Sequence, residues 1–114
     1  GGRIILMGSA FAGRLPFPGL SLYGATKAAL RGFAQGAARD LGKKGITINV
    51  VEPGPIDTDM NPADAEGAAA LAGFVATGAY GHVGDIARMV AFLARPDAGY
   101  VTGAAIPVDG GLLA

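Results

Sequence analysis

The clearest structural signal in this sequence of 114 residues is the stretch LGKKGITINVVEPG (residues 41–54). Its first part ends a helix, because two lysines stand where cations favour the negative end of a helix dipole and a glycine follows them. Its second part, residues 46–54, is rich in β-branched residues and stops at Pro53, which is typical of a buried strand. A helix therefore runs directly into a strand, as in parallel α/β folds.

Two further strands are predicted near the ends of the chain. RIILMG (residues 3–8) is a short apolar run, as expected for a strand buried on both faces. Pro16 and Pro18 exclude a helix from the loop that follows it. GAAIPVDGG (residues 103–111) is predicted to form the last short strand and a turn.

Two helices are predicted between these strands. Helical spacing over residues 21–41 places six residues on one face, which we expect to reach the core: Thr26, Leu30, Phe33, Ala34, Ala37 and Leu41. A second helix is predicted over residues 84–95, and Pro96 ends it. Its apolar stripe consists of Ile86, Met89, Val90 and Leu93. Residues 55–82 are weakly patterned and are expected to contain only short helical pieces.

The order strand, helix, strand, helix, strand predicts an α/β fold, a partial Rossmann-type doubly wound parallel sheet made of one βαβαβ half. Three parallel strands have two faces to cover, but only two strong helices are available. Some apolar surface is therefore expected to remain exposed, and a second chain or further copies of this one would cover it.

Composition restricts the possible partners and the compartment. Nine basic and nine acidic residues cancel, and no basic cluster with aromatics indicates a nucleic acid or an anionic membrane, so a small-molecule substrate is favoured. No apolar run approaches the roughly 18 residues of a membrane span. The chain has no cysteine, which excludes disulfides and thiol chemistry and suits a reducing cytoplasm.

Tyr23 and Lys27 are the first candidate reactive groups. Four residues separate them, so on a helix they lie one turn apart on the same face, with about 6 Å between their Cβ atoms. A phenol is a poor general acid or base at neutral pH, but a neighbouring ammonium favours the phenolate. Such a pair can move a proton to or from a carbonyl or alcohol oxygen. The spacing alone is also compatible with two unrelated polar groups on an ordinary helix.

Ser9 follows the first predicted strand, at the end of the sheet where ligand-facing groups of parallel α/β folds collect. A serine in this place is otherwise a turn or cap residue. With Ser9 included, the sequence resembles the short-chain dehydrogenase/reductase family over nearly its whole length. The resemblance rests on four ordered motifs: MGSAFAG (7–13), YGATK (23–27), RDLGKKGITINVVEPGPIDTDM (39–60) and GYVTGAAIPVDGG (99–111).

The resemblance implies catalytic roles for three residues. Tyr23 would be the acid/base at the substrate oxygen, and Lys27 would support it and bind the nicotinamide ribose. Ser9 would orient the substrate and stabilise developing charge. Many relatives carry two serines and use the one thirteen residues before the tyrosine, whereas Ala10 holds that position here and Ser9 is fourteen residues ahead.

The resemblance also implies a nicotinamide cofactor, NAD or NADP, and a small carbonyl or alcohol substrate. Pro53, Gly54, Ile56 and Thr58 would line the nicotinamide pocket, with backbone groups of Ile56 on the carboxamide and the hydroxyl of Thr58 nearby. The residues that select between the two dinucleotides belong to a part of the family pattern that these 114 residues do not contain.

Family members are usually about twice this length and open with a glycine-rich phosphate loop. The chain is therefore expected to be the carboxyl-terminal catalytic half, residues 1–114, without the adenosine-binding half. This leaves dinucleotide binding by the chain alone open. It also leaves a second hypothesis, a truncated, non-catalytic interaction or ligand-binding module that keeps the fold without turnover.

Ala29, Gly32 and Gly36 form a stripe of small residues on the first helix, which allows another helix to approach closely. The resemblance implies that this helix joins a contact between subunits, so a homo-oligomer is expected, most simply a two-fold dimer. Leu30 and Phe33 are expected to point away from this stripe into the core.

Three features of the remaining sequence favour ordinary structural roles. His82 is expected to be a loop residue before the second helix, and no metal site is predicted. The acidic residues Asp57, Asp59 and Asp64 read as part of a solvated lid over about residues 57–78, which is expected to be the least ordered internal segment. Leu71, Phe74 and Val75 would form the apolar side of this lid.

Overall fold

The computed structural model describes all of residues 1–114. Three parallel strands form one sheet in the order β1 (Arg3–Met7), β2 (Thr47–Pro53) and β3 (Ala105–Val108). The longer helices are α1 (Ser21–Leu41) and α3 (Val83–Ala94), and α2 (Ala68–Ala72) is a short helix between β2 and α3. Single 3₁₀ turns are η1 (Ala10–Ala12), η2 (Gly42–Lys44) and η3 (Pro96–Ala98). The fold class predicted from the sequence is confirmed.

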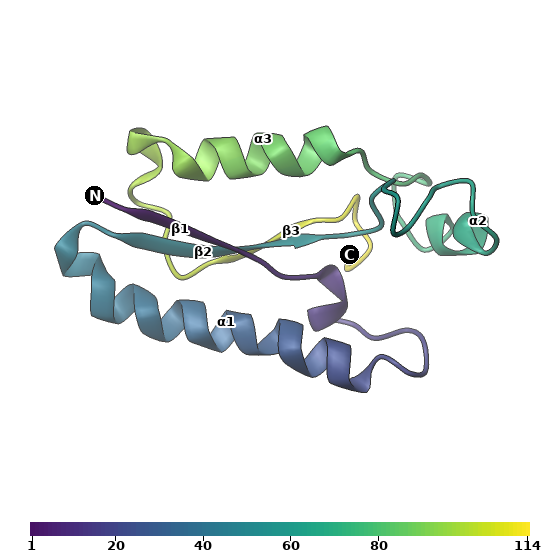
Figure 1. Cartoon of the computed structure of the whole chain (residues 1–114), viewed down its shortest axis with the longest axis horizontal. Coiled ribbons are helices and arrows are strands. Elements are labelled where there is room, and N and C mark those ends of the chain that lie inside the picture. Colours follow the sequence, from purple (N-terminus) through teal and green to yellow (C-terminus); the bar gives the residue numbers. More distant parts are fainter.

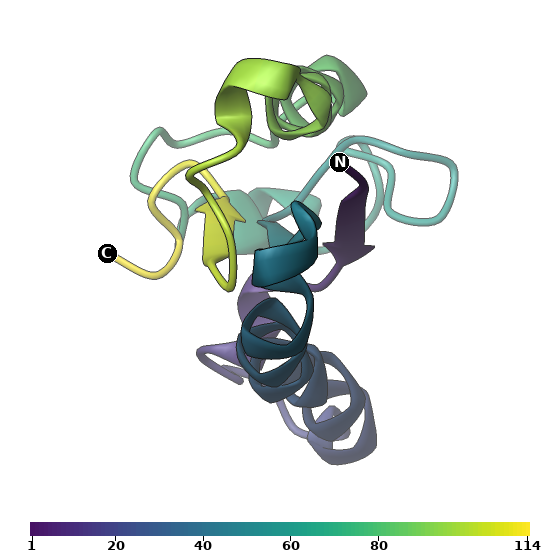
Figure 2. The same ribbon diagram turned by 90° about the vertical axis from the view of Figure 1, so that its left-hand side faces the viewer.

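The two long helices cover opposite faces of the sheet. Helix α1 lies on one face and α3 on the other, so the sheet is the middle of three layers (Figures 1 and 2). Helix α2 and the loops around it lie beyond the carboxyl ends of the strands (Figure 1). The bounds predicted for both long helices agree with the structure within one residue.

The core is centred on β2, the middle strand. Because it is hydrogen-bonded on both edges and covered on both faces, all its residues from Thr47 to Glu52 are buried. Ile48 and Val50 face α1 and pack against Ala34, a residue small enough to let the helix backbone come close to the sheet. On the other face, Leu93 is the fully buried residue of α3.

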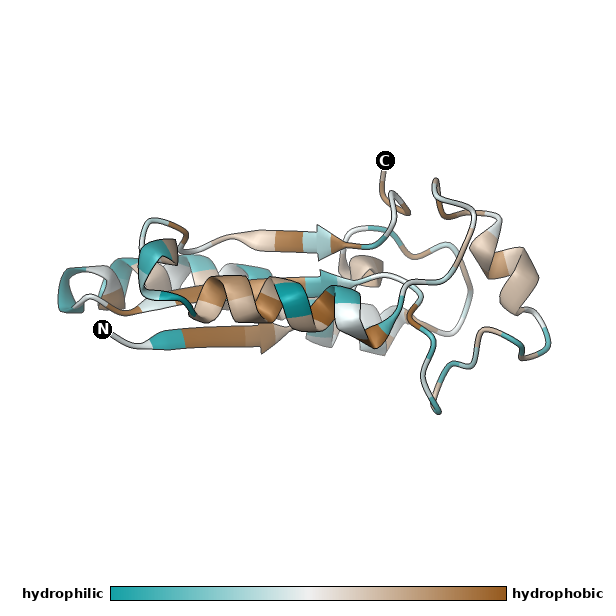
Figure 3. Cartoon of the chain, turned by 90° about the horizontal axis from the view of Figure 1, so that it is seen from above, coloured by the Kyte–Doolittle hydropathy of each residue, from teal (hydrophilic) through white to brown (hydrophobic).

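Strand β1 is less buried than its apolar sequence predicts. Ile4 is 38% exposed and Met7 is 43% exposed, so the prediction of a strand buried on both faces is wrong here. The reason is that β1 is the edge strand and pairs only with β2. Its apolar residues are visible along the outer edge of the sheet (Figure 3). The expectation of exposed apolar surface is confirmed.

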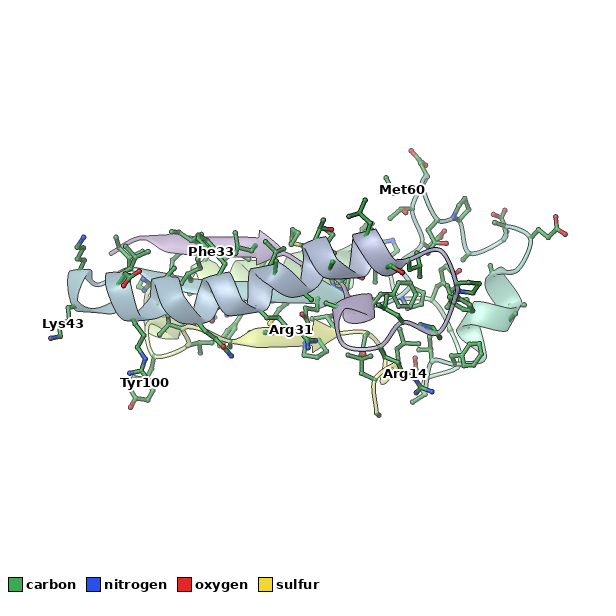
Figure 4. All side chains as sticks on the ribbon, turned by 90° about the horizontal axis from the view of Figure 1, so that it is seen from below. Arg14, Arg31, Phe33, Lys43, Met60 and Tyr100 are labelled. Atoms are coloured by element: carbon green, nitrogen blue, oxygen red, sulfur yellow. The ribbon has the colours of Figure 1, made fainter.

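Phe33 does not reach the core. It is 60% exposed and lies on the opposite side of α1 from Arg31 (Figure 4). The residues of α1 that pack on the sheet are Leu30, Ala34, Ala37 and Ala38. Phe33 lies beside this row of packed residues on the helix surface. Its large apolar side chain predicted burial, but its position on the helix leaves it exposed. Thr26, also expected on the core face, is exposed and donates to the Tyr23 carbonyl oxygen.

The loop before β3 is fastened to the middle strand by side chains. Buried Asn49 donates to the Val101 carbonyl oxygen at 2.8 Å and accepts the Ala104 N–H at 3.1 Å. The Thr102 hydroxyl oxygen accepts the Ile48 N–H at 3.1 Å. These bonds fix where β3 begins. None of the helices combines the length and apolar character needed to cross a bilayer.

Candidate active site

Ser9 closes β1 and begins the η1 turn. It is buried, and its Oγ accepts the Phe11 N–H at 3.2 Å as the cap of that turn. The turn-cap role that serine often has in this position is therefore present. Because the bond to Phe11 uses a lone pair of the oxygen, the hydroxyl proton remains available for a ligand.

Tyr23 and Lys27 lie on the first two turns of α1, as their spacing predicts. The Lys27 Nζ is 5.9 Å from the centroid of the Tyr23 ring. It also donates to the Met7 carbonyl oxygen at 3.1 Å, which ties α1 to the end of β1. The Tyr23 side chain is partly exposed, and its hydroxyl has no hydrogen-bond partner within the protein. The phenol is thus free to meet a ligand, and the ammonium is held behind it.

A cleft of about 210 Å³ brings Ser9 and Tyr23 together. Its remaining walls come from the segment after β1, the end of β2 and the loop that follows it, segment 57–78 and the carboxyl terminus: Gly8, Ala10, Phe11, Pro53, Gly54, Pro55, Asn61, Leu71 and Leu112. Most of these residues are apolar or present backbone.

A second hollow, an open groove of about 510 Å³, adjoins the cleft. Four of the six residues predicted to bind a cofactor line it: Pro53, Gly54, Ile56 and Thr58. The other two do not, since Tyr23 lines the neighbouring cleft and Lys27 lines neither hollow. The opposite wall is apolar and comes from the first half of α3, through Val83, Ile86, Ala87 and Val90. Pro53, Gly54 and Asn61 line both hollows, so a ligand in the groove would lie next to one in the cleft.

The backbone of Ile56 is suited to bind a carboxamide. A parallel bridge joins this segment to Gly81, but it uses the Pro55 carbonyl and the Asp57 N–H. The N–H and C=O of Ile56 itself have no hydrogen bond within the protein. A residue that lines the groove therefore has one unpaired donor and one unpaired acceptor, the two kinds of group that pair with a primary amide.

Asn61 was not predicted to be a site residue. Its N–H donates to the Thr58 hydroxyl oxygen at 3.1 Å, and its Oδ1 accepts the Tyr80 hydroxyl at 3.3 Å. The turn from Thr58 to Asn61 therefore holds the Thr58 side chain at the groove. An asparagine beside a proline is common in turns, so nothing in the sequence marked it as facing two hollows.

Aromatic side chains connect segment 57–78, the predicted lid, to the wall of the cleft. Phe17 stacks edge-to-face on Phe11, with ring centroids 6.2 Å apart, and on Phe74, with centroids 6.1 Å apart. Leu71 reaches the cleft, as expected for the apolar side of the lid. Val75 instead packs in a buried cluster with Ala10 and Leu112.

His82 begins α3 and has a structural role, as the sequence suggested. Its Nδ1 accepts the Gly84 N–H, and Asp85 accepts the His82 N–H at 2.7 Å, which forms a capping box. The hydrogen bond from the His82 backbone, with help from Arg88, lowers the pKa of Asp85 below its ordinary value. No group of three metal-ligating side chains is assembled in the structure.

A partly buried ion pair lies next to the site, and the sequence analysis missed it. Arg31 on α1 donates two hydrogen bonds to Glu52 on β2, Nε to Oε1 at 2.6 Å and Nη2 to Oε2 at 2.7 Å. Glu52 is fully buried, and its hydrogen bond raises the pKa of Arg31 against the opposing effect of burial. A charged residue inside a β-branched strand was the available signal, because such a charge requires a partner.

Comparison with known proteins identifies the family. Residues 1–113 match the profile of the family described as Enoyl-(Acyl carrier protein) reductase. The chain belongs to the short-chain dehydrogenase/reductase family. This confirms the resemblance that the four sequence motifs indicated.

Two curated members of the family illustrate the match. The chain is 50% identical over 110 residues to the cyclic-di-GMP-binding biofilm dispersal mediator protein of Escherichia coli (strain K12), which covers 96% of this chain and 46% of that protein. It is 46% identical over 112 residues to the 3-oxoacyl-[acyl-carrier-protein] reductase FabG of Pseudomonas aeruginosa, which covers 97% of this chain and 45% of that protein. The chain thus spans slightly less than half the length of these relatives.

Solved structures of similar chains contain nicotinamide cofactors. A blue fluorescent protein from a metagenomic library, in complex with NADPH, matches with a TM-score of 0.97 and 58% identity, covering 99% of this chain and 46% of that one. A short-chain dehydrogenase from Burkholderia cenocepacia J2315, in complex with NADP, matches with a TM-score of 0.96 and 50% identity, with the same coverage. NAD(P) binding is therefore a property of this family.

Proposed function

We propose that these 114 residues are the carboxyl-terminal catalytic half of an NAD(P)-dependent oxidoreductase that interconverts a carbonyl and an alcohol. The observation that carries this proposal is the adjacency of the cleft and the groove. Ser9 and Tyr23 line the cleft, the four candidate cofactor residues line the groove, and the two hollows share Pro53 and Gly54. Proton donors and a cofactor site are needed side by side for this reaction.

The residues of the groove fit a nicotinamide. The free N–H and C=O of Ile56 would hold the carboxamide, Thr58 offers a hydroxyl, and the apolar wall from α3 would cover one side of the ring. Lys27 has two further N–H donors besides the one on Met7, which suits the ribose hydroxyls. The bound cofactor would supply or accept the hydride.

The three catalytic candidates would have different roles at the substrate oxygen. Ser9 would donate its free hydroxyl proton to that oxygen and orient it. Tyr23 would give its proton to the oxygen in reduction and take it back in oxidation. Lys27, 5.9 Å from the ring centroid, would favour the phenolate that this transfer leaves.

We also propose a cytoplasmic homo-oligomer. The small residues Ala29, Gly32 and Gly36 are exposed, and a Cβ atom added at either glycine would meet open space. A second copy packing on this stripe would also cover neighbouring apolar side chains of α1, Leu22 and Phe33. Light scattering tests this, because Gly32→Leu with Gly36→Leu should dissociate the oligomer. A monomeric wild type would contradict it.

A non-catalytic ligand-binding module is the second candidate. It is favoured by the 50% identity to a relative that is named for binding cyclic di-GMP. In this role the cleft and groove would bind a ligand without turnover, and substitution of Tyr23 by phenylalanine would have little effect on binding.

Purified protein incubated with NADPH or NADH and a panel of ketones, including a 3-oxoacyl thioester, discriminates the two candidates. Oxidation of the reduced cofactor that Tyr23→Phe abolishes supports the oxidoreductase. Absence of turnover with every substrate, together with saturable binding of cyclic di-GMP, supports the binding module. Ser21→Ala is the matched control, because this hydroxyl lies on α1 outside the cleft.

A further inference from the structure

The two halves of α1 are held in different ways. From Leu30 onward, the helix packs on the sheet through small and medium apolar side chains, with Ala34 fully buried against Ile48 and Val50. The first half, which carries Tyr23 and Lys27, buries only Gly24. A Cβ atom on Gly24 would lie 2.6 Å from Leu15 Cδ1, so a loop side chain covers this half rather than the sheet.

The Arg31–Glu52 pair lies where these two halves meet. Arg31 is one turn after Lys27 and two turns after Tyr23 on α1. Glu52 immediately precedes Pro53 and Gly54, which line both the cleft and the groove. The two parallel hydrogen bonds, of 2.6 and 2.7 Å, specify both the distance and the orientation between the helix and the strand.

The pair also contacts the segment that carries Ser9. A Cβ atom on Gly8 would lie 3.2 Å from Glu52 Cγ, and one on Gly13 would lie 3.0 Å from Arg31 Nη2. These glycines flank Ser9 and the η1 turn. Three segments therefore meet at one ion pair: the Ser9 turn, the catalytic half of α1 and the end of β2.

Neither Arg31 nor Glu52 lines the cleft or the groove. Direct contact with substrate or cofactor is therefore not their role. Such a pair also contributes little to stability compared with apolar residues of similar volume, because the Glu52 carboxylate must leave water completely and Arg31 in part. The pair fixes the distance and the orientation between α1 and β2. The small alanine side chains of α1 do not fix them by themselves.

We propose that Arg31 and Glu52 are positioning residues that hold the catalytic half of α1 in register with Ser9 and the cofactor groove. The inference rests on the proposed function, since it assigns the pair to the same site. Without the two hydrogen bonds, the first half of α1 shifts or opens while the packed second half stays in place. The first half can move in this way because it buries only Gly24, under the loop side chain of Leu15.

The decisive variant is Arg31→Met with Glu52→Met, which replaces both charges by flexible apolar side chains of similar length. Amide hydrogen exchange of the chain is measured in two segments of α1, residues 25–31 and 34–41. We expect exchange in 25–31 to become roughly tenfold faster and exchange in 34–41 to stay unchanged. Unchanged exchange in 25–31, or equal acceleration of both segments, would overturn the proposal.

Arg95 and Asp97 provide a matched control. They form the same two-bond geometry, Nε to Oδ1 at 2.8 Å and Nη2 to Oδ2 at 2.6 Å, but on the surface and away from the site. Arg95→Gln with Asp97→Asn should leave exchange in both segments of α1 as in the wild type. If this control accelerated residues 25–31 as much as the buried variant does, the effect would not be specific and the proposal would fail.

The reductase assay adds a readout that a purely structural role would not change. Loss of positioning should lower kcat roughly 10- to 100-fold and leave KM within about twofold, because the misplaced group acts in the transition state. Arg31→Lys keeps the positive charge but loses the planar guanidinium that donates two parallel hydrogen bonds. Its kcat should therefore lie between that of the wild type and that of the double variant. Equal kcat in the wild type and the double variant would overturn the proposal. A wild type without turnover would instead reject the proposed function, and hydrogen exchange would still decide the positioning role.

Discussion

The two long helices of this chain are built for different tasks. Helix α3 begins with a capping box, buries Leu93 and lays an apolar stripe across the sheet. Helix α1 begins at Leu20 without a side-chain cap, and its first half carries a free phenol and an ammonium instead of core residues. The comparison teaches that α3 stabilises the fold and forms a wall of the groove. The first half of α1 has fewer stabilising contacts and carries the candidate catalytic residues Tyr23 and Lys27.

The strongest test of this contrast is Tyr23→Phe on α1. It removes the transferable proton but keeps the ring, so turnover should fall by at least ~10²-fold, within the range of general acid/base contributions. The free energy of unfolding should change little, because the hydroxyl has no partner in the protein. Steady-state kinetics and thermal unfolding measure both quantities. Near-normal turnover would remove Tyr23 from the mechanism.

Leu93→Ala on α3 should have the opposite profile. It opens a cavity under a fully buried side chain and should lower the free energy of unfolding by about 2–5 kcal/mol. Phe92→Ala is the control, since Phe92 is adjacent but partly exposed. It should lower the free energy of unfolding clearly less than Leu93→Ala does. Denaturant unfolding measures the difference. An equal loss of unfolding free energy in both variants would mean that Leu93 does not hold α3 on the sheet.

Lys27→Ala should lower turnover by roughly tenfold, because the charge that develops on the phenol during proton transfer loses its neighbouring cation. It should also loosen the start of α1 slightly, since the bond to the Met7 carbonyl is lost. Lys43→Ala, in the exposed η2 turn, is the control. Steady-state turnover equal to that of the wild type would contradict the coupling of Tyr23 to Lys27.

The smallest effect concerns the cap of α3 in acid. Hydrogen bonds lower the pKa of Asp85 in the folded state below its ordinary value of 3.8. Its contribution to stability is therefore present above that value and is lost as the pH falls through the lower, folded-state value. Between about pH 5 and pH 3, the wild type should lose more stability than Asp85→Asn. Parallel pH dependence of the two proteins would show that the cap contributes nothing.

Much of this architecture follows from local sequence. The bounds of α1 were predictable, because prolines precede it and the GKKG segment ends it, with Gly45 in the left-handed conformation (φ 73°) beyond η2. The spacing of Tyr23 and Lys27 and the position of Ser9 after β1 predicted which groups would meet at the carboxyl ends of the strands. These features depend on residues that are close together in the sequence.

The features that the sequence did not predict depend on neighbours distant in the chain. Burial of β1 was overestimated because an apolar run does not reveal whether a strand is central or at an edge. Phe33 was placed in the core because helical periodicity does not show how closely a sheet approaches, and the contact here is made by Ala34. The Arg31–Glu52 pair joins residues 21 positions apart, so only the folded chain reveals it.

The most direct test of the account is a titration of the isotope-labelled chain with reduced nicotinamide mononucleotide, followed by NMR. This probe carries the nicotinamide and its ribose, for which the groove offers Ile56 and Thr58, with Lys27 bonded to the Met7 carbonyl oxygen at its edge. The account predicts saturable shifts at these residues and at Tyr23, with none in the distant groove between Gln35 and Thr102. Absence of shifts at millimolar probe, or shifts confined to that distant groove, would contradict it.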